Sequence, residues 1–229
     1  MILETRHSIP ELLSRQPVFR GMSRRGLLEL AAHTHEYRVA RQELLFQKGD
    51  AARAMYLVVT GQVKLFLPSE SGVEKVVHMA EPGESFGEES LFLDRSYPVG
   101  AEASKDSIIL AVDKAPLMEQ VARTPTLAQA MIDRLSTRFI DLVGSLESCV
   151  QKNSTERVAD FLIQRAPAEA ASFAFQLDTD KQTVASQLNL APETLSRVLG
   201  RLAKAGYIHV HGRSITVMDA GALRGYAGA

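Results

Sequence analysis

Several residue types that mark particular classes of protein are scarce or missing from this chain of 229 residues. It contains one cysteine, Cys149, and no tryptophan. Its apolar runs are far shorter than the roughly 20 residues that a membrane-spanning helix needs. A single cysteine excludes a disulfide within the chain and a four-cysteine iron–sulfur site. The start reads MILETRHSIPELL and lacks a basic segment followed by an apolar one, so we expect no export signal and a cytoplasmic location.

Catalytic signatures are also scarce. The sequence contains no His-Glu-x-x-His, no phosphate-binding loop and no two-cysteine metal motif, so we do not expect an enzyme. The net charge of −1 gives no basic footprint overall, but five basic residues and one acid between Lys181 and Arg213 give a local charge of +4. Affinity for nucleic acid is therefore expected in the C-terminal part.

The segment from Asp180 to Ile208 predicts a helix-turn-helix. Asp180 suits the N-cap of a first helix that runs to about Leu188. Asn189 tolerates the left-handed backbone of a tight turn, and Pro192 suits the first turn of a second helix. The inner face of that second helix is apolar and consists of Leu195, Val198, Leu199 and Leu202.

The outer face of the second helix carries side chains that read base edges. Arg197 can bond guanine O6 and N7, Glu193 can accept from the cytosine amine, and Ser196 can bond either way. In this motif the N-terminal end of the second helix enters the major groove. Other side chains suit phosphate contacts, namely Thr183, Thr194, Arg201, Lys204, Arg213 and Ser214. The alternative is a buried three-helix packing unit with solvated charges.

Further elements surround this motif. Residues from Tyr207 to Val217 form a predicted hairpin that turns at Gly212, a wing. A helix from Thr155 to Arg165 and a strand near Phe173 to Leu177 come before the motif. We therefore expect a winged helix-turn-helix DNA-binding domain over residues 154–229.

The region from about Glu36 to Val112 is predicted to be β, after a helical lead-in from Ile9 to about His35. Turn signals recur at intervals of 12, 11 and 11 residues, at Gly49-Asp50, Gly61, Gly72 and Pro82-Gly83. Short apolar strands lie between them, at Met55 to Val59, Val63 to Leu67 and Lys75 to Met79. Regular turns at this spacing favour an antiparallel β-roll or jelly roll. We assign residues 1–120 to this domain and expect an α+β fold.

A long helix is predicted from about Pro125 to Lys152. Its apolar seam has steps of four and three residues, which is typical of a coiled coil, and contains Ala128, Ile132, Leu135, Phe139, Leu142, Leu146 and Cys149. We expect residues 121–153 to form a homodimer through this seam, with Cys149 as a small core residue rather than a redox switch. The alternative is a helix packed on its own domain through Met131, Ile140, Val143 and Val150.

A β-roll, a long helix and a winged helix in this order resemble the Crp/Fnr superfamily of bacterial transcription regulators. The resemblance covers nearly the whole chain and rests on FQKGDAARAMYLVVTGQVKLF (Phe46 to Phe66), PGESFGEESLF (Pro82 to Phe92) and ETLSRVLGRLAKAGYI (Glu193 to Ile208). DRSYPVGAEA (Asp94 to Ala103) and the recognition helix look closest to the Dnr-like and Fnr-like branch. The resemblance implies a dimer on an inverted repeat of double-stranded DNA, half-sites like TTGAT or TTGAC, and RNA polymerase as a partner.

The resemblance also implies an effector pocket between roll and long helix. In cyclic-nucleotide-binding relatives, a Gly-Glu pair starts a phosphate cassette and a following arginine pairs with the phosphate. Here Gly87-Glu88 fits the start, or simply makes a tight turn. Tyr97 stands at the arginine position, and Arg95 lies two residues early. The polar pair that meets the adenine aligns with Leu142 and Val143, so cyclic AMP is not the expected effector.

Haem is the leading named candidate for the effector, because some Dnr-like relatives are thought to sense nitric oxide through it. Haem needs an axial ligand, and the histidines are the candidates, among them His78, His33, His35 and His7. The alternative for each is an ordinary polar or hydrogen-bonded histidine. Two hypotheses follow. The first is a dimeric transcription regulator whose roll senses a signal, by haem or by a cyclic nucleotide. The second is an effector-binding module whose winged helix contacts other proteins. A base-reading set at Glu193, Ser196 and Arg197 favours the first.

Overall fold

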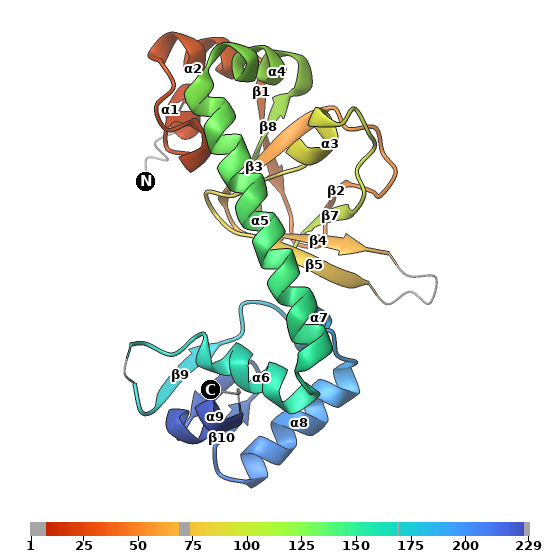
Figure 1. Cartoon of the computed structure of the whole chain (residues 1–229), viewed down its shortest axis with the longest axis vertical. Helices are drawn as coiled ribbons and strands as arrows, with labels where there is room; N and C mark the ends of the chain where they lie inside the picture. The colour runs from red at the N-terminus through yellow and green to blue at the C-terminus, as the bar shows by residue number, and fades with distance from the viewer. Residues whose placement is uncertain (1–7, 69–73, 169, 227–229) are drawn as a thin grey trace, which may run out of the picture. The chain divides into compact units, whose positions relative to one another are not determined.

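The computed structural model describes residues 8–68, 74–168 and 170–226. The chain forms two compact units, residues 1–140 and 141–229, and each is described by itself. The turn expected at Gly72 lies outside the described residues. Figure 1 shows the order of elements within each unit.

The N-terminal lead-in is helical, as predicted, and is divided into two short helices and a 3-10 turn. It consists of α1 (Ile9–Ser14), η1 (Pro17–Phe19) and α2 (Arg24–Ala31), and strand β1 already begins at Thr34. Pro17 starts the 3-10 turn, and Gly21 has a positive φ of 91° after it. A proline cannot donate the backbone hydrogen bond that a helix interior needs, so the helical pattern breaks there.

Two four-stranded antiparallel sheets form the roll, as the turn spacing predicted. One has the strand order β1-β8-β3-β6 and the other β2-β7-β4-β5. The strands are β1 (Thr34–Val39), β2 (Leu44–Phe46), β3 (Ala54–Thr60), β4 (Val63–Leu67), β5 (Lys75–Ala80), β6 (Ser85–Phe86), β7 (Gly100–Ala103) and β8 (Ser107–Asp113). The turn between β3 and β4 requires glycine, because Gly61 has a φ of 88° and an added Cβ would lie 2.1 Å from Ser107 Oγ.

Three helices complete the first unit. Helix α3 (Glu88–Phe92) follows β6, and α4 (Lys114–Arg123) was not anticipated from the sequence. Helix α5 (Pro125–Gln151) confirms the predicted long helix almost to the residue. Its first turns belong to this unit, because Leu127 and Met131 are buried in one core cluster with Leu12, Leu13 and Leu117.

The second unit is a winged helix-turn-helix, as predicted. Its elements are α6 (Ser154–Ile163), β9 (Phe173–Gln176), α7 (Lys181–Gln187), α8 (Pro192–Lys204), β10 (Ile208–His211), β11 (Ser214–Val217) and α9 (Ala220–Tyr226). The three strands pair in the order β10-β11-β9. The side chain of Asn153 caps α6 by accepting from the N–H groups of Thr155 and Glu156. Helix α9 was not foreseen; Ala220 and Leu223 bury it in the unit's core.

Candidate DNA-binding and signal-sensing sites

The helix-turn-helix is built by the local signals that the sequence displays. The Asp180 side chain accepts from the Thr183 N–H at 2.8 Å and caps α7. Asn189 has a φ of 56°, and the N–H of Leu190 donates back to the Ala185 carbonyl at 2.9 Å. This is the left-handed helix ending that asparagine tolerates. Pro192 then occupies the first turn of α8.

Helix α8 has one buried and one exposed face. Leu195, Val198, Leu199 and Leu202 are at most 5% exposed and pack into the unit's core. Glu193, Ser196 and Arg197 are exposed. Arg197 Nη2 lies 3.4 Å from Thr194 Oγ1, a long hydrogen bond that costs little to replace. The predicted base-reading side chains thus share the solvent face of one helix and are available to a ligand.

The predicted phosphate contacts lie in different surroundings. Lys204 is exposed near the end of α8, whereas Arg201 Nη2 donates to Thr155 Oγ1 at 2.7 Å. Arg213 donates from Nε and Nη2 to the Leu177 carbonyl at 3.1 and 2.7 Å. Those two bonds tie the wing to the end of β9 and engage donors that a phosphate would otherwise use. Thr183, Thr194 and Ser214 are half-buried.

In the roll, the Gly-Glu pair forms a helix start with a buried carboxylate. Gly87 has a φ of 89° and is the N-cap of α3, and Glu88 is fully buried. Ser85 Oγ donates to Glu88 Oε1 at 3.1 Å. Burial raises the pKa of Glu88, with the positive charge of Arg138 opposing that shift. The pair therefore builds both a tight turn and a buried acidic group.

Tyr97, which the sequence analysis expects at the arginine position of the cassette, is buried in the roll. Its ring is 3% exposed and stacks on Phe46 with centroids 3.8 Å apart. Its hydroxyl donates to the Ala54 carbonyl at 2.6 Å and accepts from the Ala54 N–H at 3.3 Å. An added Cβ at Gly87 would lie 3.0 Å from the Tyr97 ring. Arg95 is exposed.

Two arginines that the sequence analysis did not single out hold α5 against the cassette. Arg134 and Arg138 donate from their Nη2 atoms to the Ser85 carbonyl at 3.2 and 2.9 Å. Arg134 Nη1 pairs with Glu84 Oε1 at 3.0 Å, and Arg138 Nη1 lies 4.0 Å from Glu88 Oε1. The only signal in the sequence is their spacing of four residues, which places both on one helix face.

His78 is linked to the same charged group. Its Nε2 lies 3.2 Å from Glu84 Oε2, and that oxygen also accepts from the Glu81 N–H at 2.9 Å. Burial alone would raise the pKa of Glu84, but these hydrogen bonds and the charges of His78 and Arg134 lower it to about 2. Over the part of the chain that the structure describes, no cluster of three or more His, Cys, Asp or Glu side chains is arranged to hold a metal ion.

The letters Gly83 to Gly87 also match the spacing of a hydrolase nucleophile elbow. An elbow needs its serine exposed at the apex of a strand-to-helix turn. Ser85 instead lies inside β6, is 1% exposed and donates to Glu88. The geometry does not match an activated nucleophile.

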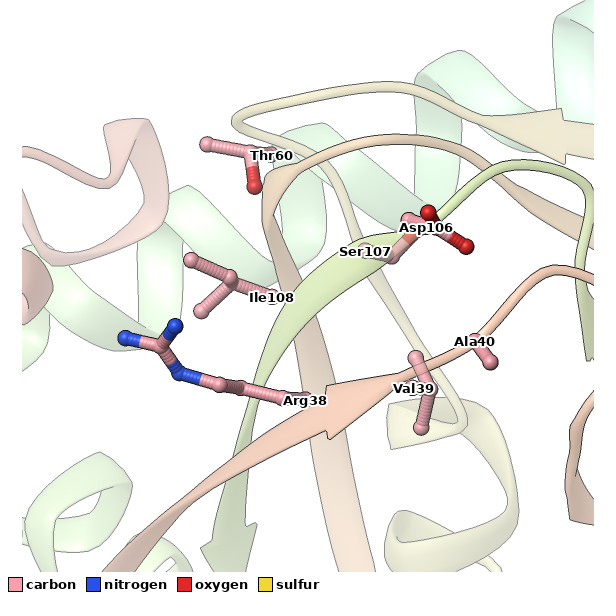
Figure 2. Close-up of a pocket in the computed structure, with 7 residues that line it drawn as sticks. All are labelled: Arg38, Val39, Ala40, Thr60, Asp106, Ser107 and Ile108. Carbon is pink, nitrogen blue, oxygen red and sulfur yellow. The ribbon is translucent and has the colours of Figure 1, made fainter.

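A shallow pocket of about 400 Å³ lies elsewhere on the roll, where β1 and β3 end and β8 begins. Figure 2 shows its lining side chains, which are Arg38, Val39, Ala40, Thr60, Asp106, Ser107 and Ile108. None of them belongs to the predicted effector set. Asp106 Oδ1 accepts from the Arg41 N–H at 2.9 Å, so its carboxylate already orders the loop after β1.

The seam of α5 is largely exposed. Ile132, Phe139 and Leu146 are 57, 67 and 70% exposed, and Leu142 is 50% exposed. The alternative of packing on the same chain holds for Met131, which is buried, but Ile140, Val143 and Val150 are exposed as well. Leu142 and Val143, expected in the effector pocket, thus present half of their surface to solvent.

Known families match both units. Residues 36–124 match the model of a cyclic nucleotide-binding domain, and residues 156–226 match that of a Crp-like helix-turn-helix domain. The chain is 28% identical over 189 residues to an anaerobic regulatory protein of Pasteurella multocida, which covers 81% of this chain and 69% of that protein. It is 22% identical over 213 residues to a CRP-like cAMP-activated global transcriptional regulator of Mycobacterium tuberculosis, covering 91% and 95%.

Solved structures agree with this assignment. The structure of FixK2 from Bradyrhizobium japonicum is similar with a TM-score of 0.73 and 25% identity, over 86% of this chain and 98% of that one. A sensing roll of the cyclic nucleotide-binding type, a long helix and a Crp-like helix-turn-helix define a DNA-binding transcription regulator. The chain belongs to the Crp/Fnr superfamily of transcription regulators. Among the described residues, no helix has the length and apolar character to cross a membrane.

Proposed function

We propose that this regulator binds an inverted repeat of double-stranded DNA as a homodimer, in the cytoplasm, and acts on RNA polymerase. The observation that supports this most is the solvent face of α8, where Glu193, Ser196 and Arg197 are exposed while the opposite face is packed. Arg197 would select a guanine and Glu193 a cytosine. By family resemblance the half-site is TTGAT or TTGAC. Selection of binding sites from random DNA tests this proposal, and recovered sites without two-fold symmetry would refute it.

The dimer contact in this proposal is the seam of α5. Apolar side chains that are half to two-thirds exposed along one helix form a stripe that monomers in water avoid. A two-fold dimer buries the stripe of one protomer against the same stripe of its partner. The two recognition helices are then related by the two-fold axis, as the half-sites of a palindromic site are. Sedimentation of the protein at micromolar concentration tests the dimer directly.

The signal in this proposal is not cyclic AMP. A cyclic phosphate needs a cation at the cassette. By family resemblance, the buried neutral ring of Tyr97 would stand in that place, and Arg95 is exposed. Arg134 and Arg138 approach the cassette from α5, but their Nη2 atoms bond the Ser85 carbonyl. The positive charges of Arg134 and Arg138 therefore already have acceptors within the protein.

Haem is the effector that we propose in place of cyclic AMP. His78 would supply an axial nitrogen, and the Glu84 carboxylate at 3.2 Å would orient its ring, as carboxylates do for metal-bound histidines. Bound haem would supply an iron centre that takes up nitric oxide or oxygen. The absorption spectrum of freshly purified and of haem-reconstituted protein tests this. The absence of a Soret band in both would remove haem, and an unchanged band in His78→Ala would remove His78.

A further inference from the structure

The turn between α7 and α8 is held by a side chain from a third helix. Arg157, on α6, donates from Nη1 to the Leu188 carbonyl at 3.0 Å and to the Asn189 carbonyl at 3.2 Å. Carbonyls at the end of a helix have no partner within the helix, so an external donor is needed to satisfy them. Asn189 is also the residue whose left-handed backbone makes the turn.

Helix α6 is a rigid support for this contact. Its neighbours Val158 and Ala159 are completely buried in the unit's core. Asn153 and Glu156 close its N-terminus with a reciprocal pair of hydrogen bonds. One turn of α6 also reaches the recognition helix itself, because Thr155 accepts from Arg201 on α8 at 2.7 Å. The same turn of α6 therefore fixes both the turn and α8.

We propose that Arg157 is a positioning residue for DNA recognition, which sets the angle at which α8 leaves the turn. This inference rests on the proposed function, in which α8 reads base edges. Direct readout tolerates little misalignment, because bidentate hydrogen bonds to bases need fixed geometry. Phosphate contacts tolerate more, since they are mainly Coulombic and independent of sequence. Loss of the Arg157 contacts should therefore reduce specific binding more than non-specific binding.

The experiment compares two duplexes, one with an inverted repeat of TTGAT and one with scrambled sequence, by fluorescence anisotropy at fixed salt. Arg157→Met keeps an apolar stem and removes both hydrogen bonds. We expect it to lower the ratio of specific to non-specific affinity about tenfold, comparable to the loss of one base contact. Arg157→Lys should recover part of the ratio, because its ammonium keeps the charge and three hydrogen-bond donors. Arg224→Met, which removes an exposed charge from α9, should leave the ratio unchanged.

Hydrogen exchange gives a readout that does not depend on DNA. In Arg157→Met the amides of Asn189 and Leu190, which donate to Ser186 and Ala185, should exchange at least several-fold faster, while amides in the core of α8 keep their protection. Unchanged exchange at these two amides, or an unchanged affinity ratio, overturns the inference. If the wild-type protein itself shows no preference for the inverted repeat, the proposed operator fails, and the exchange measurement still decides the role of Arg157.

Discussion

The ring of Tyr97 stacks on Phe46 with centroids 3.8 Å apart, and its hydroxyl bonds both backbone groups of Ala54. Tyr56 and Phe86 form a second stacked pair in the same cluster, with centroids 5.4 Å apart. A tyrosine held on its face and at its tip cannot swing aside without losing packing and orphaning buried polar groups. The ring of Tyr97 is therefore fixed in place beside Gly87.

From this packing we predict that cyclic AMP does not bind with micromolar affinity. The nucleotide would have to displace Tyr97, which is packed on Phe46 and bonded to Ala54. Isothermal titration calorimetry checks this, with a relative that is known to be cAMP-activated as the positive control. Tyr97→Ala should open space without creating affinity, because it supplies no positive charge. Measurable micromolar binding to the wild-type protein would contradict the prediction.

A second prediction concerns Glu84 and acid. Its pKa is lowered from 4.5 to about 2, so its ionised form stabilises the folded state above the unfolded pKa. That stabilisation is up to about 3 kcal/mol and is lost as the pH falls from about 5 toward 2. Glu84→Gln should therefore lower the free energy of unfolding near neutral pH, measured in urea.

The difference between wild type and Glu84→Gln should shrink as the pH is lowered, because the wild-type carboxyl then becomes neutral too. Glu147→Gln, a change on the exposed part of α5, provides a control for removing one carboxylate. A difference that stays constant between about pH 7 and pH 3 would show that Glu84 acts through shape and not through charge.

Local signals made much of the fold predictable. The cap at Asp180, the left-handed Asn189 and the proline of α8 are each decided by residues within one turn, and the structure confirms them. The helical lead-in was predicted correctly, but its division into α1, η1 and α2 was not foreseen; a 3-10 turn that starts at Pro17 separates the two helices. Helix α9 was missed because it is a single short segment, whose helical state depends on burial of Ala220 and Leu223 against the core.

The contacts of the cassette could not be predicted in the same way. Arg134 and Arg138 bond the Ser85 carbonyl across 49 and 53 residues of chain. No pattern within a few residues of sequence predicts that this face of α5 packs against β6. Likewise, Tyr97 could be aligned with the arginine position from the sequence, but its stack on Phe46 appears only when β2 and the segment before β7 come together. Long-range pairing decides both.

The third prediction concerns the seam. Leu135→Asp combined with Phe139→Asp should produce monomers with weak DNA affinity. In a two-fold contact the two added carboxylates of one helix would lie against those of the partner helix and repel them. Thr137→Asp, on the same helix but off the seam, should leave the dimer intact. Sedimentation velocity and DNA titration check both variants. A wild-type protein that sediments as a monomer at micromolar concentration would contradict the prediction that the seam forms a dimer.

The fourth prediction separates stability from recognition at Gly200. This glycine lies on the exposed face of α8, and an added Cβ would meet nothing within 4 Å. Gly200→Ala should stabilise the protein by about 0.5–1 kcal/mol in urea, because alanine loses less backbone entropy in a helix. It should weaken DNA binding, since a methyl group then lies on the face that approaches the groove. Gly144→Ala on α5 meets equally open space and should stabilise without affecting DNA.

The last prediction distinguishes reading of bases from contact with phosphates. Arg197→Ala should cost about 1–3 kcal/mol at the preferred site and relax the preference at one guanine, because only that base pair loses its bidentate partner. Lys204→Ala should weaken binding to all sequences alike and reduce the salt dependence, since a phosphate contact releases counterions whatever the sequence. Both side chains are exposed on α8, so neither change removes core packing.

Titrations of both variants against matched and single-substitution duplexes, at several salt concentrations, measure the two effects separately. Two recognition helices in a two-fold dimer contact major grooves about 34 Å apart, so half-site centres should lie about 10 base pairs apart. Moving the half-sites by half a helical turn should abolish specific binding by the wild-type protein and leave its non-specific binding unchanged. An Arg197→Ala protein with an unaltered base preference would show that α8 does not read DNA through this face.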